Sequence, residues 1–175
     1  MKLQTDEQLM RQVANGELKL LSVLFERHHK HVYNFIFQMS GDKDLSEDIV
    51  QEVFFKILKH RATFGEGKFI AWMFTIARNS LSGHYKKEQR FTTTKETIVA
   101  EVVEDPECKE QYSDLHAALA KLTPTDREVV VLNRLQGIRY EELAIILNST
   151  PNAVKTKVSR ALDKLRKVYF KQVEV

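Results

Sequence analysis

The 175-residue sequence contains little cysteine, proline or glycine, with one, three and six residues respectively. The one cysteine, Cys108, cannot form a disulfide within the chain, which excludes a disulfide-stabilised scaffold and suits a reducing compartment. No apolar run approaches the roughly 20 residues of a membrane helix, and the start MKLQTDEQLM does not match a signal peptide. We therefore expect a soluble, cytoplasmic protein.

The sequence also lacks a large excess of one charge, since its net charge is +3, but its charges are unevenly distributed. Residues 1–87 hold 13 basic and 10 acidic side chains, residues 88–115 hold 3 and 8, and residues 116–175 hold 11 and 6. Two basic parts thus flank an acidic middle. Such asymmetry often accompanies nucleic-acid binding, although charged, solvated surfaces are common in proteins of every class.

Long amphipathic stretches with apolar residues at helical spacing favour an all-α fold. A capping box of Thr5 and Gln8 predicts a short first helix that Asn15 and Gly16 end. The next helices are expected over about residues 17–39, 44–58 and 69–88, with Asp44 and Glu47 capping the middle one.

The acidic middle separates two small helical domains. It lacks a sustained helical stripe, and its threonines and acids suit a flexible, extended linker. Beyond it, Thr123 is expected to cap a helix that Pro124 opens. The predicted parts are a four-helix domain at 1–88, the linker at 89–106 and a second domain at 107–175.

The stretch YEELAIILNSTPNAVKTKVSRAL predicts two helices joined by a tight turn, the helix-turn-helix arrangement whose second helix enters the DNA major groove. Thr150 is suited to cap the second helix and Pro151 to open it. The alternative is a surface helix with solvated lysines. The side chains offered to base edges and phosphates are Asn152, Lys155, Thr156, Lys157, Ser159 and Arg160.

Two stretches of the first domain carry surface chemistry. In EDIVQEVFFKIL, polar residues and Phe55 lie off the apolar stripe, which is typical of a protein–protein contact, unless Phe55 belongs to the core. In FGEGKFIAWMFTIARNSLSGHYKK, aromatics alternate with basic residues, a composition suited to capturing a single strand. The glycine-flanked loop could close over an extruded base. The alternative is that Phe69 and Trp72 are core residues, and for Phe69 we favour it.

Other chemistry is not indicated. His28 and His31 are one helical turn apart but have no evident third metal ligand, so an exposed polar helix face is the favoured interpretation. The sequence shows no nucleophile–base arrangement, glycine-rich phosphate loop or metal-spaced cysteine pair, so an enzyme is not expected. Cys108 is expected to be structurally neutral.

Four motifs together resemble one family, the extracytoplasmic-function (ECF) type of bacterial RNA polymerase sigma factor. They are SEDIVQEVFFKIL, FIAWMFTIARNSL, LTPTDREVVVLNRLQG and YEELAIIL followed by AVKTKVSRAL, in the expected order and spacing. The resemblance covers nearly the whole chain outside the linker. It implies that residues 1–88 are sigma region 2 and residues 107–175 are sigma region 4.

The resemblance implies that the protein binds core RNA polymerase, recognises the double-stranded −35 element and melts the −10 element to bind one of its strands. It implies no enzymatic activity, cofactor, metal or small-molecule substrate. The linker resembles the segment that threads the polymerase's RNA-exit path. Members are commonly held inactive by an anti-sigma factor, often at the membrane's inner face, so we expect such a partner and a role in a stress or envelope response.

The resemblance also assigns residues to each contact, with a flipped base expected between the loop and the helix that follows it. Core polymerase binding is expected of Asp48, Gln51, Glu52, Phe55 and Lys56. Recognition and melting of the −10 element is expected of Phe64, Lys68, Trp72, Arg78, Asn79, Tyr85 and Lys86. Recognition of the −35 element is expected of Asn152, Lys155, Thr156, Lys157, Ser159 and Arg160.

Two positions depart from the family pattern. Gly83 stands where Asp is usual, which affects the end of the −10 helix and its phosphate contacts. Arg139 stands where Ser or Thr usually caps the first helix of the pair, so a cap worth roughly 1 kcal/mol is expected to be missing. A competing interpretation is a response-regulator-like transcription factor, which would bind half-sites as a dimer and would not need the two motifs of the first domain.

Overall fold

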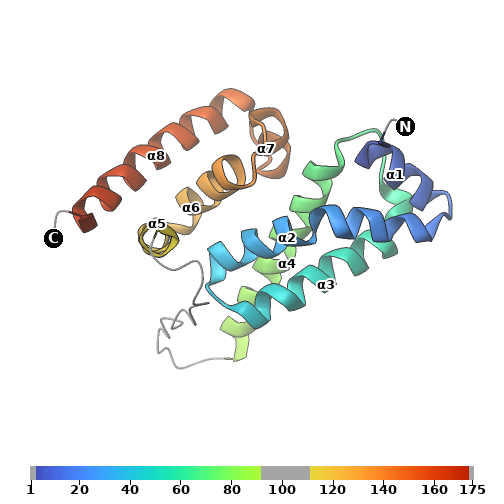
Figure 1. Cartoon of the computed structure of the whole chain (residues 1–175), viewed down its shortest axis with the longest axis horizontal. Helices are drawn as coiled ribbons and strands as arrows, with labels where there is room; N and C mark the ends of the chain where they lie inside the picture. The colour runs from blue at the N-terminus through green and yellow to red at the C-terminus, as the bar shows by residue number, and fades with distance from the viewer. Residues whose placement is uncertain (1–2, 92–110, 174–175) are drawn as a thin grey trace. The chain divides into compact units, whose positions relative to one another are not determined.

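The computed structural model describes residues 3–91 and 111–173, and in these residues it consists of helices without a β-strand (Figure 1). The predicted all-α class is confirmed. The elements are α1 (Asp6–Ala14), η1 (Leu18–Leu20), α2 (Leu21–Ser40), α3 (Lys43–Lys59), η2 (Arg61–Thr63), α4 (Phe69–Phe91), α5 (Gln111–Ala120), α6 (Pro124–Val130), η3 (Val131–Leu135), α7 (Tyr140–Ile146) and α8 (Pro151–Val173).

The described residues divide into two compact units. The first comprises residues 3–36 and 43–91, and the second comprises residues 37–42 and 111–173. Most of the predicted linker, and Cys108 with it, lies outside the described residues, so the predicted boundaries at 88 and 106 stay predictions. Helix α4 continues past its predicted end at Glu88 to Phe91.

Helix α1 begins as the sequence predicts. Thr5 accepts a hydrogen bond from the backbone N–H of Gln8, whose side chain accepts one from the backbone N–H of Thr5. The helix ends at Ala14, and Gly16 follows with a φ of 111°, a left-handed conformation that glycine adopts without strain. The next predicted helix is preceded by the short 3₁₀ turn η1, and α2 proper starts at Leu21.

Helix α3 starts earlier than expected. Its first residue is Lys43, so Asp44 lies in the first turn and Glu47 lies further inside; the prediction that they cap the helix is wrong. An acidic residue in the first turn still stabilises the helix, because its charge opposes the positive end of the helix dipole. Gly41, at a φ of 67°, makes the turn between α2 and α3.

The core of the first unit is formed by the apolar stripes that the sequence predicts. Helix α3 packs along α4, and α1 covers one end through Met10 and Val13, which are fully buried. Phe69, at the start of α4, is also fully buried, which confirms its assignment to the core. The other fully buried residues include Leu24, Val32, Phe35, Ile36, Ile49, Val53, Ile57, Met73 and Ala77.

The second unit is organised around α8, which α5, α6 and α7 contact. Thr123 caps α6 by accepting from the N–H of Asp126, as predicted. Arg127 donates to the carbonyls of Leu119 and Ala120 at 2.9 and 2.8 Å, which satisfies orphan acceptors at the end of α5. The π-helical turn η3 after α6 was not predicted.

The helix-turn-helix motif is closed by caps on both sides of its turn. Arg139 makes no side-chain cap for α7, which confirms the expected missing cap. After α7, Asn148 adopts a φ of 51°, and the Ser149 N–H donates to the Ala144 carbonyl at 2.8 Å. Thr150 then caps α8 by accepting from the N–H of Ala153 at 3.3 Å. The predicted tight turn is confirmed.

Candidate nucleic-acid interface

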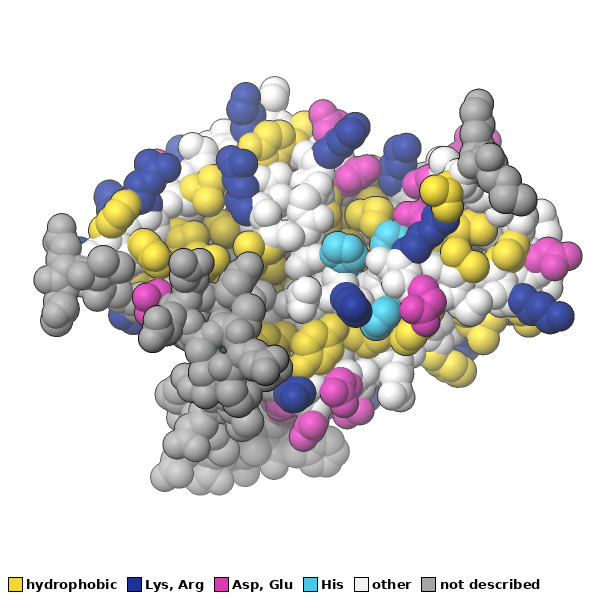
Figure 2. All heavy atoms as spheres, viewed as in Figure 1, with side chains coloured by type: hydrophobic (Ala, Val, Ile, Leu, Met, Phe, Trp, Pro, Cys, Tyr) yellow, Lys and Arg dark blue, Asp and Glu magenta, His cyan; other side chains and the backbone are white. Residues whose placement is uncertain are grey.

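Helix α8 has one buried side and one exposed basic side. Val154, Val158 and Ala161 are fully buried against the rest of the second unit. Lys and Arg side chains are spread over α8 in Figure 2. The Thr156 hydroxyl donates a hydrogen bond of 3.1 Å to the backbone carbonyl of Asn152, one turn earlier in the same helix. All six residues predicted to contact duplex DNA are exposed: Asn152, Lys155, Thr156, Lys157, Ser159 and Arg160.

One lysine of α8 forms an ion pair with another helix. Lys164 forms an ion pair of 2.8 Å with Asp126 of α6. The hydrogen bond from Lys164 is the largest influence on the Asp126 carboxyl and lowers its pKa. This pair joins α8 to α6, whereas Lys155, Lys157 and Arg160 in the N-terminal half of α8 are exposed.

Three aromatic rings meet at the start of α4, and we call Phe64, Phe69 and Trp72 the aromatic cluster. The Phe64 and Trp72 ring centroids are 5.2 Å apart, and the Phe64 and Phe69 centroids are 6.2 Å apart. Phe64 and Trp72 are half-buried, whereas Phe69 is buried beneath them. Because the Phe64 and Trp72 rings already touch, a flipped base would stack on their outer surface or separate them.

The remaining residues predicted for the −10 element lie along α4, except Lys68, which immediately precedes this helix. Trp72, Asn79 and Lys86 are spaced by seven residues, so they share one helix face over roughly 20 Å. Arg78 and Tyr85 have the same spacing but lie about a quarter turn or more around the helix. Lys68, Asn79, Tyr85 and Lys86 are exposed and Arg78 is half-buried.

The residues predicted to bind core polymerase divide into two groups. Asp48, Gln51 and Phe55 are exposed, with Phe55 64 % exposed, and we call them the outer face of α3. The alternative that Phe55 belongs to the core is wrong. Glu52 and Lys56 are half-buried and form an ion pair of 2.6 Å.

Glu52 and Lys56 also bind α4, through two residues that the sequence did not single out. The Glu52 carboxylate contacts His84 Nε2 at 3.1 Å, and Lys56 Nζ donates to the Ser80 hydroxyl at 3.0 Å. Partial burial disfavours the charged form of Glu52, but hydrogen bonds from Lys56 and His84 outweigh it and lower the pKa of this carboxyl. The Glu52–His84 and Lys56–Ser80 contacts join residues far apart in the sequence, so no local sequence pattern reveals them.

A groove of about 400 Å³ between α2 and α3 adjoins the outer face of α3. It shares Gln51 with that face. Inside it the rings of Phe25 and His29 stack at 4.7 Å. Burial is the largest influence that raises the pKa of Tyr33. The lining residues are Phe25, His29, Lys30, Tyr33, Asn34, Glu47, Val50 and Gln51.

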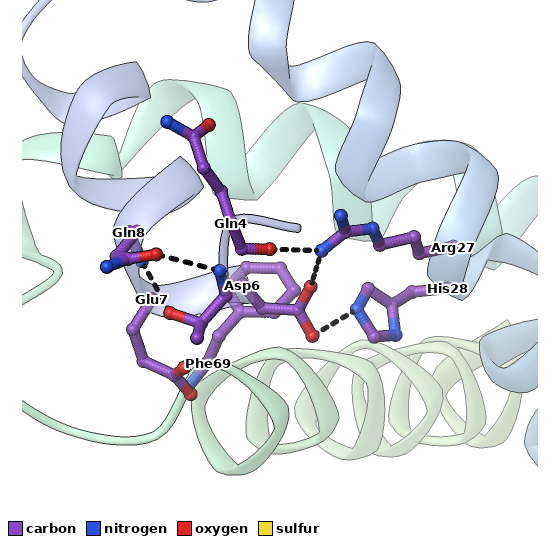
Figure 3. Close-up of polar contacts among 8 residues, drawn as sticks. Gln4, Asp6, Glu7, Gln8, Arg27, His28 and Phe69 are labelled. Carbon is purple, nitrogen blue, oxygen red and sulfur yellow. Dashed lines mark hydrogen bonds and ion pairs between the residues drawn. The ribbon is translucent and has the colours of Figure 1, made fainter. Parts of the chain in front are cut away.

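The histidine run differs from the sequence interpretation. His28 is 7 % exposed, so an exposed polar face is wrong for this residue, whereas His31 is exposed. His28 Nε2 lies 2.8 Å from the Asp6 carboxylate (Figure 3). Within residues 3–91 and 111–173, no group of three or more His, Cys, Asp or Glu residues could hold a metal ion.

Comparison with known families decides the assignment. The sigma-70 region 2 family matches residues 24–91, and the sigma-70 region 4 family matches residues 112–165. SigX of Bacillus subtilis, an ECF RNA polymerase sigma factor, is 30 % identical over 83 % of this chain and 81 % of its own length. This chain belongs to the ECF sigma factors.

Other relatives agree with that assignment. The ECF sigma factor BldN of Streptomyces coelicolor is 33 % identical over 92 % of this sigma factor, which spans 64 % of BldN. The solved structure of RpoE in complex with the anti-sigma factor NepR from Bartonella quintana has a TM-score of 0.71 at 25 % identity, covering 84 % of this chain and 94 % of that one. CnrH, solved with the cytosolic domain of CnrY, shares the fold at 23 % identity and a TM-score of 0.74, over 93 % of this chain and 96 % of that one.

As a sigma factor the protein belongs to a family of transcription initiation factors, which bind core RNA polymerase and recognise promoter DNA. The family is not one of catalytic enzymes. None of the described helices is sufficiently long and apolar to span a bilayer. The region 2 match starts at residue 24, so α1 of this sigma factor lies outside it.

Proposed function

We propose that the N-terminal half of α8 enters the major groove of the −35 element. The observation that carries this proposal is the division of α8 into a buried apolar stripe and an exposed basic face. Lys and Arg donate to guanine and to phosphates, and Asn pairs with adenine, so this face has the chemistry for duplex recognition. The residues involved are Asn152, Lys155, Thr156, Lys157, Ser159 and Arg160.

The aromatic cluster and the Trp72 face of α4 bind the non-template strand of the −10 element. Stacking of an unpaired base on Phe64 and Trp72 offsets the cost of removing that base from the duplex. Lys68 and Lys86, both exposed, neutralise phosphates on either side of Asn79. Arg78 and Tyr85, which lie further around α4, contact the strand where it leaves this face.

The outer face of α3 binds core polymerase. An exposed aromatic with polar neighbours is the usual composition of a protein–protein hot spot, and Phe55 is the central residue here. Glu52 and Lys56 contribute by holding this face against α4, and they border the contact themselves.

The protein acts in the cytoplasm, where core polymerase is its partner, and it performs no catalysis of its own. An anti-sigma factor regulates it. The solved complex of RpoE with the anti-sigma factor NepR supports this proposal, because RpoE has the fold of this chain. Release from this partner would switch on a stress or envelope response. The acidic linker at 89–106 threads the polymerase's RNA-exit path.

Abortive transcription with core polymerase and a library of promoter duplexes tests the proposal. The protein should confer initiation at promoters that share a −35 and a −10 sequence. Phe55→Ala should lower the affinity for core polymerase about 10-fold or more, the effect of losing a hot spot. Phe170→Ala is the matched control, because Phe170 is 56 % exposed on α8, outside the proposed contact.

Tight binding to duplex DNA without polymerase, and failure to support initiation, would contradict the proposed promoter contacts. Equal losses from Phe55→Ala and Phe170→Ala would contradict the assignment of the outer face of α3.

A further inference from the structure

The residue before the first turn of α4 has no side-chain hydrogen-bond acceptor that could cap this helix. The residue before Phe69 is Lys68, whose ammonium cannot accept a hydrogen bond from the free N–H groups of the helix start. Instead, the Phe69 N–H donates to Glu7 Oε1 of α1 at 3.2 Å; Figure 3 draws both residues. A carboxylate at this place both accepts the bond and opposes the positive end of the helix dipole. Glu7 therefore caps α4 from 62 residues away in the sequence.

Helix α1 is fixed in the place that this cap requires. Asp6 accepts from Arg27 Nη1 at 2.8 Å and contacts His28 Nε2 at 2.8 Å, both on α2. Arg27 Nη1 also donates to the Gln4 carbonyl at 3.0 Å. Since Glu7 follows Asp6, these bonds restrict where its carboxylate can lie (Figure 3).

The same anchor supports the aromatic cluster. The His28 ring packs on the Phe69 ring at a centroid distance of 5.4 Å, and Phe69 in turn contacts Phe64 and Trp72. Helix α1 also packs against η2, the turn that leads into the loop carrying Phe64. Contacts from α1 thus reach the aromatic cluster both through the α4 backbone and through His28.

We propose that Asp6 and Glu7 are positioning residues for the −10 element, which hold the aromatic cluster in the arrangement that receives an unpaired base. This inference rests on the proposed role of Phe64 and Trp72. Both carboxylates would repel a DNA phosphate, and both are half-buried with protein partners, so they act through α4 and His28 without touching the strand.

The test uses holoenzyme formed from core polymerase and the full chain, with a forked promoter duplex whose −10 non-template strand is single-stranded as the probe. Glu7→Ala should weaken binding of this probe roughly 5-fold, the size expected for loss of a helix cap. Glu7→Gln should lose less affinity for the probe, because the glutamine carbonyl oxygen can still accept a hydrogen bond from the Phe69 N–H. Glu17→Ala is the matched control, since Glu17 is an exposed acid just beyond α1.

Two further readouts separate positioning from simple destabilisation. Affinity for core polymerase depends on α3 of the same unit, and it should stay unchanged in Glu7→Ala. Trp72 is the sole tryptophan of the chain, so quenching of its fluorescence, measured with the full chain and the probe without core polymerase, reports directly on the aromatic cluster. This quenching should weaken in Glu7→Ala and be largely restored in Glu7→Gln.

Trp72→Ala distinguishes failure of this inference from failure of the proposed function. Loss of probe binding in Trp72→Ala but not in Glu7→Ala would overturn the positioning role and leave the −10 role of Trp72 standing. Normal probe binding in Trp72→Ala would overturn the −10 role itself. Parallel losses of core affinity and probe binding in Glu7→Ala would show that α1 only stabilises the fold.

Discussion

Lys56 of α3 donates a hydrogen bond of 3.0 Å to the hydroxyl of Ser80, an α4 residue that is 2 % exposed. The same ammonium pairs with Glu52, whose other oxygen contacts His84 of α4. The helix proposed to bind core polymerase is thereby joined, by polar contacts, to the helix proposed to bind the −10 element.

Replacing Lys56 with Met should lower the free energy of unfolding by about 1 kcal/mol, because the buried Ser80 hydroxyl loses a partner. The Glu52 ion pair adds little to this, since it is about a third exposed and screened by solvent. Urea denaturation measures the change. Lys59→Met is the matched control, because Lys59 is exposed on the same helix and should cost almost nothing. In a double-mutant cycle, the cost of Lys56→Met should shrink when Ser80 is already Ala.

The outcome for α3 illustrates what the sequence can and cannot predict. Its apolar period correctly separated the buried residues from Asp48, Gln51 and Phe55, because helical spacing alone determines which residues share a face. The same spacing could not distinguish Glu52 and Lys56, which bind α4, from their exposed neighbours. Their partners lie on another helix, and His84 is 32 residues from Glu52.

The pH dependence of stability should contain a contribution from His28. Burial lowers the pKa of this imidazole, and the Asp6 carboxylate offsets burial only in part. His28 Nδ1 has no hydrogen-bond partner among the described residues, so protonating it would place an unsatisfied N–H in the core. The unfolded chain therefore binds this proton more readily. The contribution of neutral His28 to the free energy of unfolding is at its full value above pH 6.5, the usual pKa of histidine, and it falls as the pH drops below 6.5.

Denaturation at several pH values between 5 and 8 checks this expectation. His28→Gln, which can still donate to Asp6, should make the fall in stability below pH 6.5 shallower. Burial also lowers the pKa of His116, and that contribution has the same sign and remains in the variant. His60→Gln, at an exposed position, is the control. An unchanged pH profile in His28→Gln would contradict the prediction.

Local signals in the sequence predicted three helix caps correctly and the long-range contacts poorly. The caps by Thr5, Thr123 and Thr150 join residues only three apart, so the sequence displays both partners together. The contact of His28 with Asp6 joins residues 22 apart, and the cap by Glu7 joins residues 62 apart. Such contacts depend on how whole helices pack, which residue spacing does not encode.

The turn of the helix-turn-helix motif should be sensitive to substitution of Asn148. At a φ of 51° this residue has the left-handed conformation, which Asn tolerates better than most residues and Gly adopts freely. Asn148→Ala should cost roughly 1 kcal/mol, whereas Asn148→Gly should be nearly neutral. Thermal unfolding and binding to a −35 duplex in the holoenzyme provide the two measurements. Equal destabilisation by Ala and Gly would show that the Asn side chain, and not the backbone conformation, matters here.

Salt dependence should reveal which lysines of α8 contact the −35 element. Lys157 and Lys167 are both exposed on α8 and about 15 Å apart along it, but only Lys157 lies in the half proposed to enter the groove. Removing one phosphate contact reduces the slope of log affinity against log salt by about 1. Lys157→Ala should show this reduction in holoenzyme binding to promoter duplexes, and Lys167→Ala should keep the wild-type slope.

The two variants together also determine how α8 lies on the DNA. The Thr150 cap and the buried stripe hold α8 rigidly to the second unit. If α8 enters the groove by its N-terminal turns, its C-terminal half therefore lies further from the DNA phosphates. Equal slopes for both variants, each lower than wild type, would mean that α8 lies flat along the phosphates. In that geometry Asn152 and Lys155 could not both reach base edges, and the −35 assignment would pass from direct base contacts to backbone contacts.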